Sequence, residues 1–505
     1  MPRHLLAIDQ GTTSTRALLF DEGGTPLASA RRELPQHFPR DGWVEHDAGR
    51  LFDDACLAVR EVLAAAGLAP PDLRAGAVAA VGVTNQRETV VLWERESGRP
   101  LHRALVWQDR RTADHCERLR AAGHEARLQE KTGLLLDPYF SATKIAWLLD
   151  ALPGARARAE RGELLCGTVD SWLLWNLRGP RPADGARHLT DATNAARTAL
   201  FDLRRQRWDD DLLALFSVPR ALLPEVLDSA ADFGACDPAL FGAPLPLRGV
   251  AGDQQAAAVG QACFRAGQVK CTYGTGAFLL LAAGERLPVS RHRLLGTVAL
   301  RLAGAPSYAL EGSIFSAGSS IQWLRDGLHL FAQAKDSEAL AATADPARRV
   351  HLVPAFTGLG APHWDAAARG AILGLTRDVT AADLTAAALQ AVAFQTADLL
   401  SAMAADGAPR PAALRVDGGL SENGYAMQFL ADVLDLPVER PACVETTALG
   451  VALLAGLGAG VFSSTDELAA RWRLAARFLP RMAAAERDER LAGWRAAVLR
   501  VLSHG

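Results

Sequence analysis

The stretch Asp9-Gln10-Gly11-Thr12-Thr13-Ser14 lies between two short apolar runs, residues 5–8 and 17–20. Apolar runs of this length, bounded by turn residues, are typical of buried strands, so the segment predicts a strand, a tight turn and a second strand. Gly11 lets the backbone pass close to a ligand, and the hydroxyls and N–H groups of the turn are donors suited to a phosphate, with Arg16 within reach. Asp9, at the strand end, can hold Mg²⁺ through water. Taken alone, the stretch is equally compatible with a hairpin that has a polar tip.

A similar pattern recurs in the middle of the chain. Gly252-Asp253-Gln254-Gln255 again combines an Asp-Gln pair with glycine, and the turn Gly274-Thr275-Gly276 separates the strand-like runs 269–273 and 277–281. Two such hairpins, one opening each half, predict two related domains that face a shared nucleotide. Phosphoryl transfer depends mostly on positioning and electrostatics, and a closing cleft supplies both.

Composition indicates a globular chain of several domains. At ~150 residues per domain, the 505 residues correspond to two to four domains, and a hydrophobic content of 49% is ample for large cores. The net charge of −3 argues against a general nucleic-acid or anionic-membrane binder. The seven cysteines are scattered, without a C-x-x-C motif, which predicts a reducing cytoplasm.

No segment is expected to enter a membrane. Asp9 interrupts the first apolar run, so no secretory signal is predicted. The longest uncharged apolar stretch, residues 448–462, is shorter than the ~20 residues that a span requires and contains four glycines. We interpret it as a buried helix and its end. The charged, arginine-rich segment 466–501 is expected to be a solvated helical face.

Strand-like and helix-like runs alternate along the chain, which predicts an α/β fold. Residues 78–83 and 90–93 have strand character, and residues 51–65 and 384–400 have apolar residues at helical spacing. A loop rich in proline and glycine approaches residue 250, so we expect domains at 1–250 and 251–505. The chain contains neither a P-loop nor a G-x-G-x-x-G after a strand, so the nucleotide site is of neither common type.

Beyond these patterns, the chain resembles the FGGY carbohydrate kinases of the actin-like ATPase superfamily, and within them the branch that phosphorylates glycerol. The resemblance runs nearly end to end. Its segments include residues 9–14, 42–47, 84–89, 106–112, 137–141, 252–255, 273–276, 355–362 and 415–419. It implies two actin-like (ribonuclease H-like) domains flanking a deep cleft for nucleotide and substrate. It also implies ATP and Mg²⁺ as cofactors, and ATP-dependent phosphorylation of glycerol to sn-glycerol 3-phosphate as the activity.

The resemblance implies a polyol site made of hydrogen-bonding and aromatic residues. A triol carries no charge, so donors and acceptors must hold it, and leaving them unpaired rejects a substrate that lacks a hydroxyl. Apart from the family, Arg87-Glu88 is more simply a surface ion pair and Trp107 a core residue. The implied residues are Arg87, Glu88, Tyr139, Asp253 and Gln254, with Trp107 and Phe278 as an aromatic wall.

Asp253 resembles the family's catalytic aspartate and is the expected general base, accepting a proton from the primary hydroxyl. An aspartate in this position can also be a helix N-cap, since residues from 256 onward look helical. Asp9 is the second choice for the base, although its place beside the hydroxyl turn suits the metal better. Asp9 and Asp253 are therefore also the expected Mg²⁺ residues, partly through water.

By the same resemblance, nucleotide contacts come from both halves. Thr12, Thr13, Ser14 and Arg16 are expected to hold phosphates from one domain, and Thr275, with Gly274 and Gly276, from the other. Glycines let a flat base stack against backbone. The nucleoside and adenine contacts are expected from Gly318, Gln322, Gly419 and Asn423.

The chain lacks the residues that two kinds of regulation require in relatives. The loop 233–244 carries no arginine to hold a sugar bisphosphate, and no histidine occurs between His188 and His292 for phosphorylation. We expect neither control to operate. The partners implied are glycerol and further copies of the chain, as a dimer or tetramer, without nucleic acid or stable membrane insertion.

Two other functions stay open at this point. One is a kinase of the same architecture for another polyol or a ketose, which the contacts at Arg87, Glu88 and Trp107 would distinguish. The other is a non-catalytic nucleotide switch that opens and closes, against which the intact Asp9 and Asp253 argue.

Overall fold

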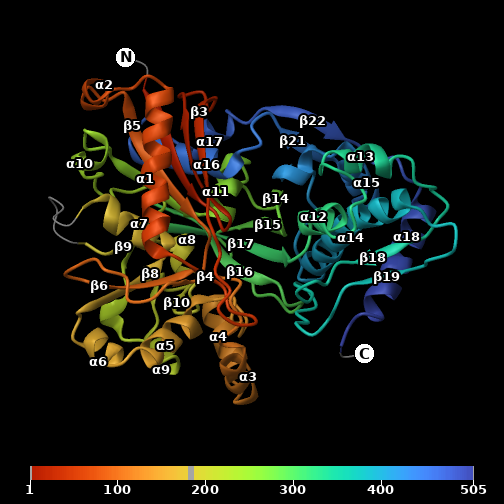
Figure 1. Ribbon diagram of the computed structural model, residues 1–505, viewed down its shortest axis with the longest axis horizontal. Coiled ribbons are helices and arrows are strands. Elements are labelled where there is room, and N and C mark those ends of the chain that lie inside the picture. The colour runs from red at the N-terminus through yellow and green to blue at the C-terminus, as the bar shows by residue number, and fades with distance from the viewer. Residues whose placement is uncertain (1–2, 180–186, 504–505) are drawn as a thin grey trace.

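A computed structural model describes residues 3–179 and 187–503. The two halves of the chain lie side by side (Figure 1), with N-terminal residues on one side and most residues beyond 317 on the other. The opening stretch forms the expected hairpin: β1 (His4–Gln10) pairs antiparallel with β2 (Ser14–Phe20). The second glycine turn does the same between β14 (Val269–Tyr273) and β15 (Ala277–Gly284).

Each half is built on a mixed sheet of the same topology. In the first sheet the order is β13-β5-β1-β2-β3, and the second contains β21-β20-β14-β15-β17, with β16 and β22 added at its edges. In both sheets three antiparallel strands are followed by two parallel ones. The two-domain α/β prediction is thereby confirmed. The remaining strands of these sheets are β3 (Pro26–Glu33), β5 (Val78–Asn85), β13 (Leu247–Gly252), β16 (Leu295–Leu302), β17 (Ala305–Ile314), β20 (Leu414–Asp417), β21 (Val438–Pro441) and β22 (Leu474–Phe478).

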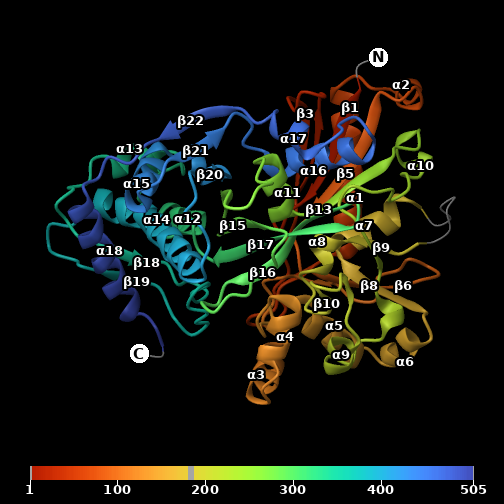
Figure 2. The same ribbon diagram turned by 180° about the vertical axis from the view of Figure 1, so that it is seen from behind.

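Helices cover both faces of the first sheet. α1 (Ala48–Ala65) and α7 (Val169–Leu177) pack with strand residues in one core. α11 (Asp253–Gly260) and α16 (Thr446–Gly458) pack in another, on the opposite face. α16 is the buried helix expected at 448–462. Figures 1 and 2 show it, from the C-terminal end of the chain, among the N-terminal strands.

The junction between α11 and α16 depends on glycine. A Cβ on Gly450 would lie 1.8 Å from the Ala256 carbonyl oxygen, and one on Gly260 would lie 2.1 Å from that of Thr446. α11 follows β13 and α16 follows β21, so the equivalent helices of the two halves meet here. β13 spans residue 250, and α16 from the second half packs against the first sheet. The expected division into domains at residue 250 stays a prediction.

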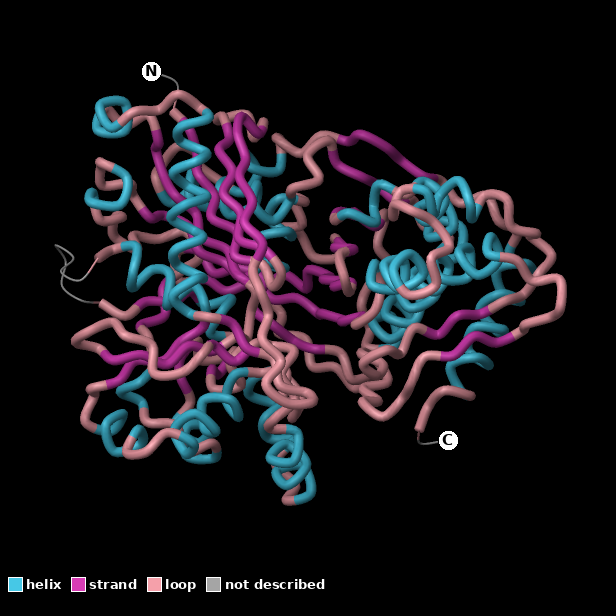
Figure 3. The backbone as a smooth tube through the Cα atoms, viewed as in Figure 1, coloured by secondary structure: helices cyan, strands magenta, loops and turns pink. Residues whose placement is uncertain are grey.

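A smaller sheet and its helices complete the N-terminal half. Its order is β4-β7-β6-β8. Its core is made mainly by residues such as Val90, Ile145 and Leu223, with Leu295, Val298 and Tyr308 added from the second sheet. Figure 3 shows the strands and helices of this region at the lower left, below the first sheet. The remaining elements of the N-terminal half are β4 (Glu45–His46), β6 (Val90–Glu94), β7 (Ala104–Leu105), β8 (Leu164–Thr168), β9 (Leu189–Asp191), β10 (Phe201–Asp202), β11 (Arg207–Trp208), β12 (Glu225–Leu227), α2 (Pro70–Arg74), α3 (Ala113–Ala121), α4 (Glu125–Thr132), α5 (Ser141–Ala151), α6 (Ala155–Glu160), α8 (Ala192–Ala195), α9 (Asp210–Leu215) and α10 (Pro238–Phe241).

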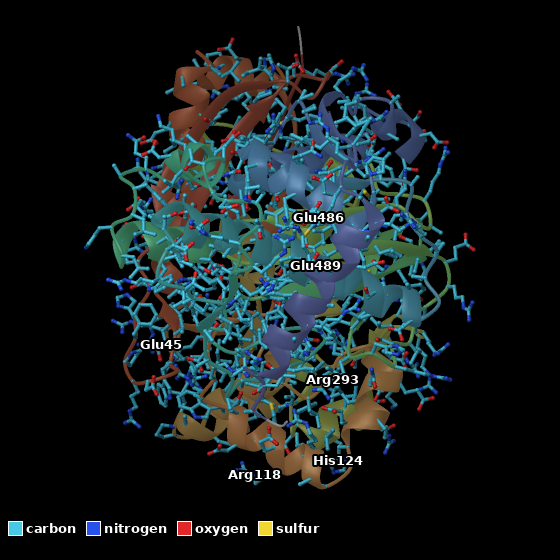
Figure 4. The ribbon with its side chains drawn as sticks, turned by 90° about the vertical axis from the view of Figure 1, so that its right-hand side faces the viewer. Glu45, Arg118, His124, Arg293, Glu486 and Glu489 are labelled. Carbon is cyan, nitrogen blue, oxygen red and sulfur yellow. The ribbon has the colours of Figure 1, made fainter. Side chains whose placement is uncertain are left out.

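The C-terminal segment differs from its prediction. Residues 466–501 are not one helix, because β22 forms an edge strand of the second sheet before α18 (Ala484–Leu499) begins. α18 does lie along the outside (Figure 4), where its Glu489 pairs with Arg349 at 3.2 Å. The other elements of the C-terminal half on this side are α12 (Gly318–Asp326), α13 (Asp336–Ala341), α14 (Ala381–Ala405), α15 (Gly424–Leu434), β18 (His351–Val353) and β19 (Ala371–Leu373). The short helix α17 (Thr465–Ala469) instead lies beside α16, in the core against the first sheet. In the described part of the chain, no helix has the length and apolar character that crossing a bilayer requires.

Candidate active site

The polar residues of the site collect at one edge of the first sheet. β1, β5 and β13 run parallel, and in their registers Asp9 pairs with Thr84 and Asn85 with Gly252. The carboxyl ends of the three strands therefore meet at one level. Asp9, the Arg87 loop and Asp253, far apart in sequence, emerge there together, as ligand-binding residues of such sheets commonly do.

Arg16, expected to hold phosphate, lies between two carboxylates. It donates to Asp9 Oδ2 at 2.5 Å and to Glu445 Oε2 at 2.5 Å. In the same turn the Thr12 hydroxyl accepts from Trp107 Nε1 at 2.8 Å, while Thr13 is exposed. A phosphate at this turn would thus share Arg16 with both carboxylates.

Arg87 and Glu88 are buried, so the surface-ion-pair interpretation is wrong. Their exposed fractions are 2% and 1%. Arg87 is held in a fork by Glu311, whose two carboxylate oxygens lie 2.5 and 3.0 Å from Nη1 and Nη2. Its Nε lies 3.2 Å from Asp253 Oδ1. The guanidinium plane is thereby locked against the expected base.

Arg197 completes this cluster of four buried charges. Its Nε donates to Glu88 Oε1 at 2.6 Å and its Nη2 to Glu311 Oε1 at 2.8 Å. Although burial acts to raise the pKa of Glu311, Arg197 and Arg87 hold that pKa at about 2. The two arginines balance the two glutamates, and this pairing is what permits so much buried charge.

Three aromatic rings stand beside the charged cluster. Trp107 meets Tyr139 with ring centroids 5.5 Å apart and Phe278 at 6.1 Å, both edge to face. Trp107 is only partly buried and packs at the margin of the core around the smaller sheet. The Tyr139 hydroxyl lies 3.5 Å from Arg87 Nη2. The predicted polyol residues are therefore brought together from both halves of the chain.

Asp253 is the first residue of α11, and Gly252 rather than Asp253 is the N-cap. Its Oδ1 accepts the N–H of Gln254 at 2.7 Å, and 29% of the side chain remains exposed. Burial raises the pKa of Asp253 to about 6, Arg87 opposes this rise, and the charges of Glu88 and Asp9 add to it. A carboxylate with that pKa is ionised at neutral pH and more basic than an ordinary aspartate.

The predicted nucleotide residues of the C-terminal half line one cavity of about 420 Å³. Gly318 packs on the second glycine turn, and its N–H donates to the Gly274 carbonyl at 3.0 Å. Asn423 caps α15 and donates to Ser337 at 3.2 Å, so its amide is engaged within the protein. Residues around the cavity include Gly274, Thr275, Gly318, Gln322, Lys335, Gly419 and Asn423.

The donor set fits a magnesium ion that arrives with a nucleotide. Among the described residues no three His, Cys, Asp or Glu side chains gather as a metal site, but Mg²⁺ needs only one or two carboxylates with phosphate oxygens and waters. Asp9 is near enough to Asp253 for its charge to raise the pKa of that group. These two carboxylates beside the hydroxyl turn meet the requirement.

Some residues of the site escaped the sequence reasoning. Glu311 and Lys270 are each the single charged residue of a largely buried strand, and a charge in such a strand is a usable signal for a paired, buried group. Arg197 and Thr193 carry no such signal. Thr193 nonetheless accepts the Gly252 N–H at 2.9 Å, and Asp191 in turn accepts from the Thr193 hydroxyl at 2.9 Å, so both support the backbone at the base.

Comparison with known families agrees with this architecture. Residues 4–260 match the N-terminal domain, and residues 269–459 the C-terminal domain, of the FGGY family of carbohydrate kinases. This chain belongs to the FGGY family of carbohydrate kinases.

Several relatives that match the whole chain are named glycerol kinase. This chain is 57% identical over 503 residues to glycerol kinase 1 of Pseudomonas aeruginosa, and the match covers all of both chains. It is 58% identical over 500 residues, 99% of both chains, to a glycerol kinase of Xanthobacter autotrophicus. Among solved structures, Plasmodium falciparum glycerol kinase with ADP superposes with a TM-score of 0.90 at 33% identity, covering 100% of this chain and 99% of that one. A xylulose kinase of Rhodospirillum rubrum superposes with a TM-score of 0.83 at 25% sequence identity, covering 99% of each chain.

Proposed function

We propose that this protein transfers the γ-phosphoryl group of ATP to glycerol, forming sn-glycerol 3-phosphate, as the first step of glycerol utilisation. The observation that carries the proposal is the buried Arg87–Glu88 pair beside Asp253, under the rings of Trp107 and Phe278. A small, uncharged polyol matches this combination of dense hydrogen-bonding groups and an apolar wall. The full-length relatives named glycerol kinase support the same substrate.

Binding follows from the donors and acceptors available. Glu88 accepts from a hydroxyl through the oxygen that Arg197 leaves free, and Tyr139 and Gln254 offer further contacts. The N–H groups of Arg87 already face Glu311, Gln255, Asp253 and, at a longer distance, Tyr139. A substrate hydroxyl would therefore accept from the Nη2 group that lies 3.5 Å from the Tyr139 hydroxyl, sharing it with Tyr139. Such a site discriminates by hydroxyl pattern, because an absent hydroxyl leaves buried polar groups unpaired.

Asp253 then acts as general base. As the primary hydroxyl oxygen of glycerol forms its bond to the γ-phosphorus, the bond from that phosphorus to the β-bridging oxygen breaks, and the hydroxyl proton passes to the Asp253 carboxylate. Arg87 beside Asp253 orients the carboxylate. ADP leaves with the bridging oxygen.

The two glycine and hydroxyl turns bind the nucleotide. Thr12, Thr13, Ser14 and Arg16 approach its phosphates from the first half and Thr275 from the second, with the base in the cavity near Gln322 and Gly419. Asp9 and Asp253 would hold Mg²⁺, partly through water, and the ion would neutralise phosphate charge.

The decisive test measures ADP release with ATP and Mg²⁺ across glycerol, dihydroxyacetone, xylulose, ribulose and gluconate. We expect glycerol-dependent turnover that is lost in Asp253→Asn. Turnover with a ketose but not with glycerol would keep the kinase and overturn the substrate. ATP binding without turnover on any compound would favour a nucleotide switch.

The same proposal extends to regulation, assembly and location. The loop 233–244 contains no arginine, although Arg248 donates to its Gly234 carbonyl at 2.8 Å, and we expect no tight inhibition by fructose 1,6-bisphosphate. A titration that found such inhibition would contradict this.

We further propose a homodimer or homotetramer in the cytoplasm. All seven cysteines are unpaired, which suits a reducing compartment.

A further inference from the structure

Lys270 is a fully buried lysine beside the proposed base. It lies on β14, and its Nζ donates to Gln254 Oε1 at 2.5 Å and to Thr272 Oγ1 at 2.9 Å. Burial lowers the pKa of Lys270, while Asp417 and Asp253 oppose this effect. Removing an ammonium group from water is costly unless it is paired. Its place here therefore calls for a role.

The chemistry of the ammonium group fixes the amide of Gln254. A lysine ammonium has three donors and no acceptor, so it must face the amide oxygen and not the amide nitrogen. The Nε2 group of Gln254 consequently points the other way. Across residues 3–179 and 187–503 it has no protein acceptor within hydrogen-bonding distance. Lys270, which holds the other end of this amide, is close enough to Asp253 for the two charges to interact, so the unused donor belongs to the neighbourhood of the proposed base.

We propose that Lys270 is a positioning residue that sets the amide orientation of Gln254, so that Nε2 donates to a hydroxyl of the bound polyol and selects for it. The inference rests on the proposed function and deepens it. Gln254 alone can present either end of its amide. Lys270 removes that freedom and makes the position a donor, complementary to the acceptor Glu88.

The test compares the wild type with Lys270→Met, which nearly keeps the length of the side chain and removes donor and charge. We expect kcat/KM for glycerol to fall about 10- to 100-fold, mainly through KM, as for loss of a charged hydrogen bond in a binding site. ADP affinity and the melting temperature serve as controls for the fold and the neighbouring glycine turn.

A double-mutant cycle with Gln254→Leu tests whether Lys270 acts through Gln254. In the Gln254→Leu background the KM effect of Lys270→Met should largely vanish. Equal KM effects in both backgrounds, or an unchanged KM in Lys270→Met, would overturn the inference. If Lys270→Met lost ADP binding in proportion to activity, Lys270 would have a structural role, and this result would also overturn the inference.

The outcome separates the two proposals. A wild type that phosphorylates glycerol, with a Lys270→Met variant of wild-type kinetics, would leave the proposed function intact and remove the role of Lys270. A wild type that neither binds nor phosphorylates any polyol of the panel would overturn both.

Discussion

At the scale of single residues, the chemistry depends on how neighbours tune a few carboxylates. Glu311 and Asp253 lie on either side of Arg87, yet their pKa values move in opposite directions, to about 2 and about 6. Two arginines meet Glu311, whereas for Asp253 burial and the charges of Glu88 and Asp9 outweigh Arg87. One is thereby kept ionised as a structural anchor, and the other is left basic enough to take a proton.

The first prediction concerns the pH dependence of turnover. Asp253 must be ionised to accept a proton, so kcat/KM should fall about tenfold per pH unit below about pH 6 and be level above it, over the range where the fold persists. Rates measured between pH 4.5 and 8.5, at saturating ATP, check this. An acid limb near pH 4, the range of an ordinary aspartate, would contradict the raised pKa.

The same shift predicts a gain in stability for Asp253→Asn. The pKa is raised above that of the unfolded chain, so the carboxyl favours the folded state at low pH, and this contribution is lost as pH rises through about 6. At pH 7.5 the neutral variant should be more stable than wild type by on the order of 1 kcal/mol, and at pH 4 by much less. Denaturant unfolding at both pH values measures the difference. Equal stability of the two proteins at pH 7.5 would count against it.

Glu311→Gln, in contrast, should lower the stability of the protein. Its carboxylate is the shared partner of Arg87 and Arg197, and removing it leaves two buried guanidinium groups with only Glu88 and Asp253 to balance them. Breaking a buried pair in this way costs about 3–5 kcal/mol. Chemical denaturation gives the loss directly, and the exposed pair Arg349–Glu489 supplies the control: Glu489→Gln should change stability by less than about 1 kcal/mol.

At the scale of elements, the site depends on how closely α11 and α16 approach. Gly260 and Gly450 bring the two helices into backbone contact, and α16 in turn lies directly on the first sheet, where a Cβ on Gly82 would meet the Val451 carbonyl at 2.3 Å. Because α11 begins at Asp253, its seating against α16 also sets the position of the proposed base.

Gly450→Ala therefore tests the junction. Its new methyl group would meet the Ala256 carbonyl at 1.8 Å, and backbone cannot move aside as a side-chain tip can. We expect destabilisation of about 2–3 kcal/mol with a larger loss of kcat than of nucleotide binding. Thermal unfolding and ADP titration measure the two effects. Ser401→Ala, at an exposed position of α14, is a matched helical control and should be near neutral.

At the scale of the whole molecule, the two halves are joined through the site itself. Arg16 from the first hairpin pairs with Glu445, 429 residues further along the chain, and Glu311 of the second sheet holds Arg87 of the first half. The proposed polyol and nucleotide sites thus both draw on groups from each half. Figure 2 shows the strands β16 and β17 extending from the second sheet toward the N-terminal half.

Glu445→Gln should free Arg16 for a nucleotide phosphate. Glu445 and phosphate compete for the same guanidinium, so the KM for ATP should fall about two- to fivefold while the KM for glycerol is unchanged. The pair is partly exposed, hence stability should change by no more than about 1 kcal/mol. Initial rates at varied ATP measure the effect. A rise in the KM for ATP would show that Glu445 instead positions Arg16.

The sequence by itself determined the local elements and the outline of the site. Alternating apolar runs and glycine turns specify the two hairpins, because strand and turn preferences act over a few residues, and the motif residues Arg87, Glu88, Tyr139 and Asp253 were predicted and do lie together. Tertiary structure alone decided that Arg87–Glu88 is buried, that Glu311, Arg197 and Lys270 surround it, that Gly252 caps α11, and that residues 474–478 form a strand. These outcomes depend on contacts between residues up to hundreds of positions apart, where burial and charge pairing, and not local preference, set the free energy.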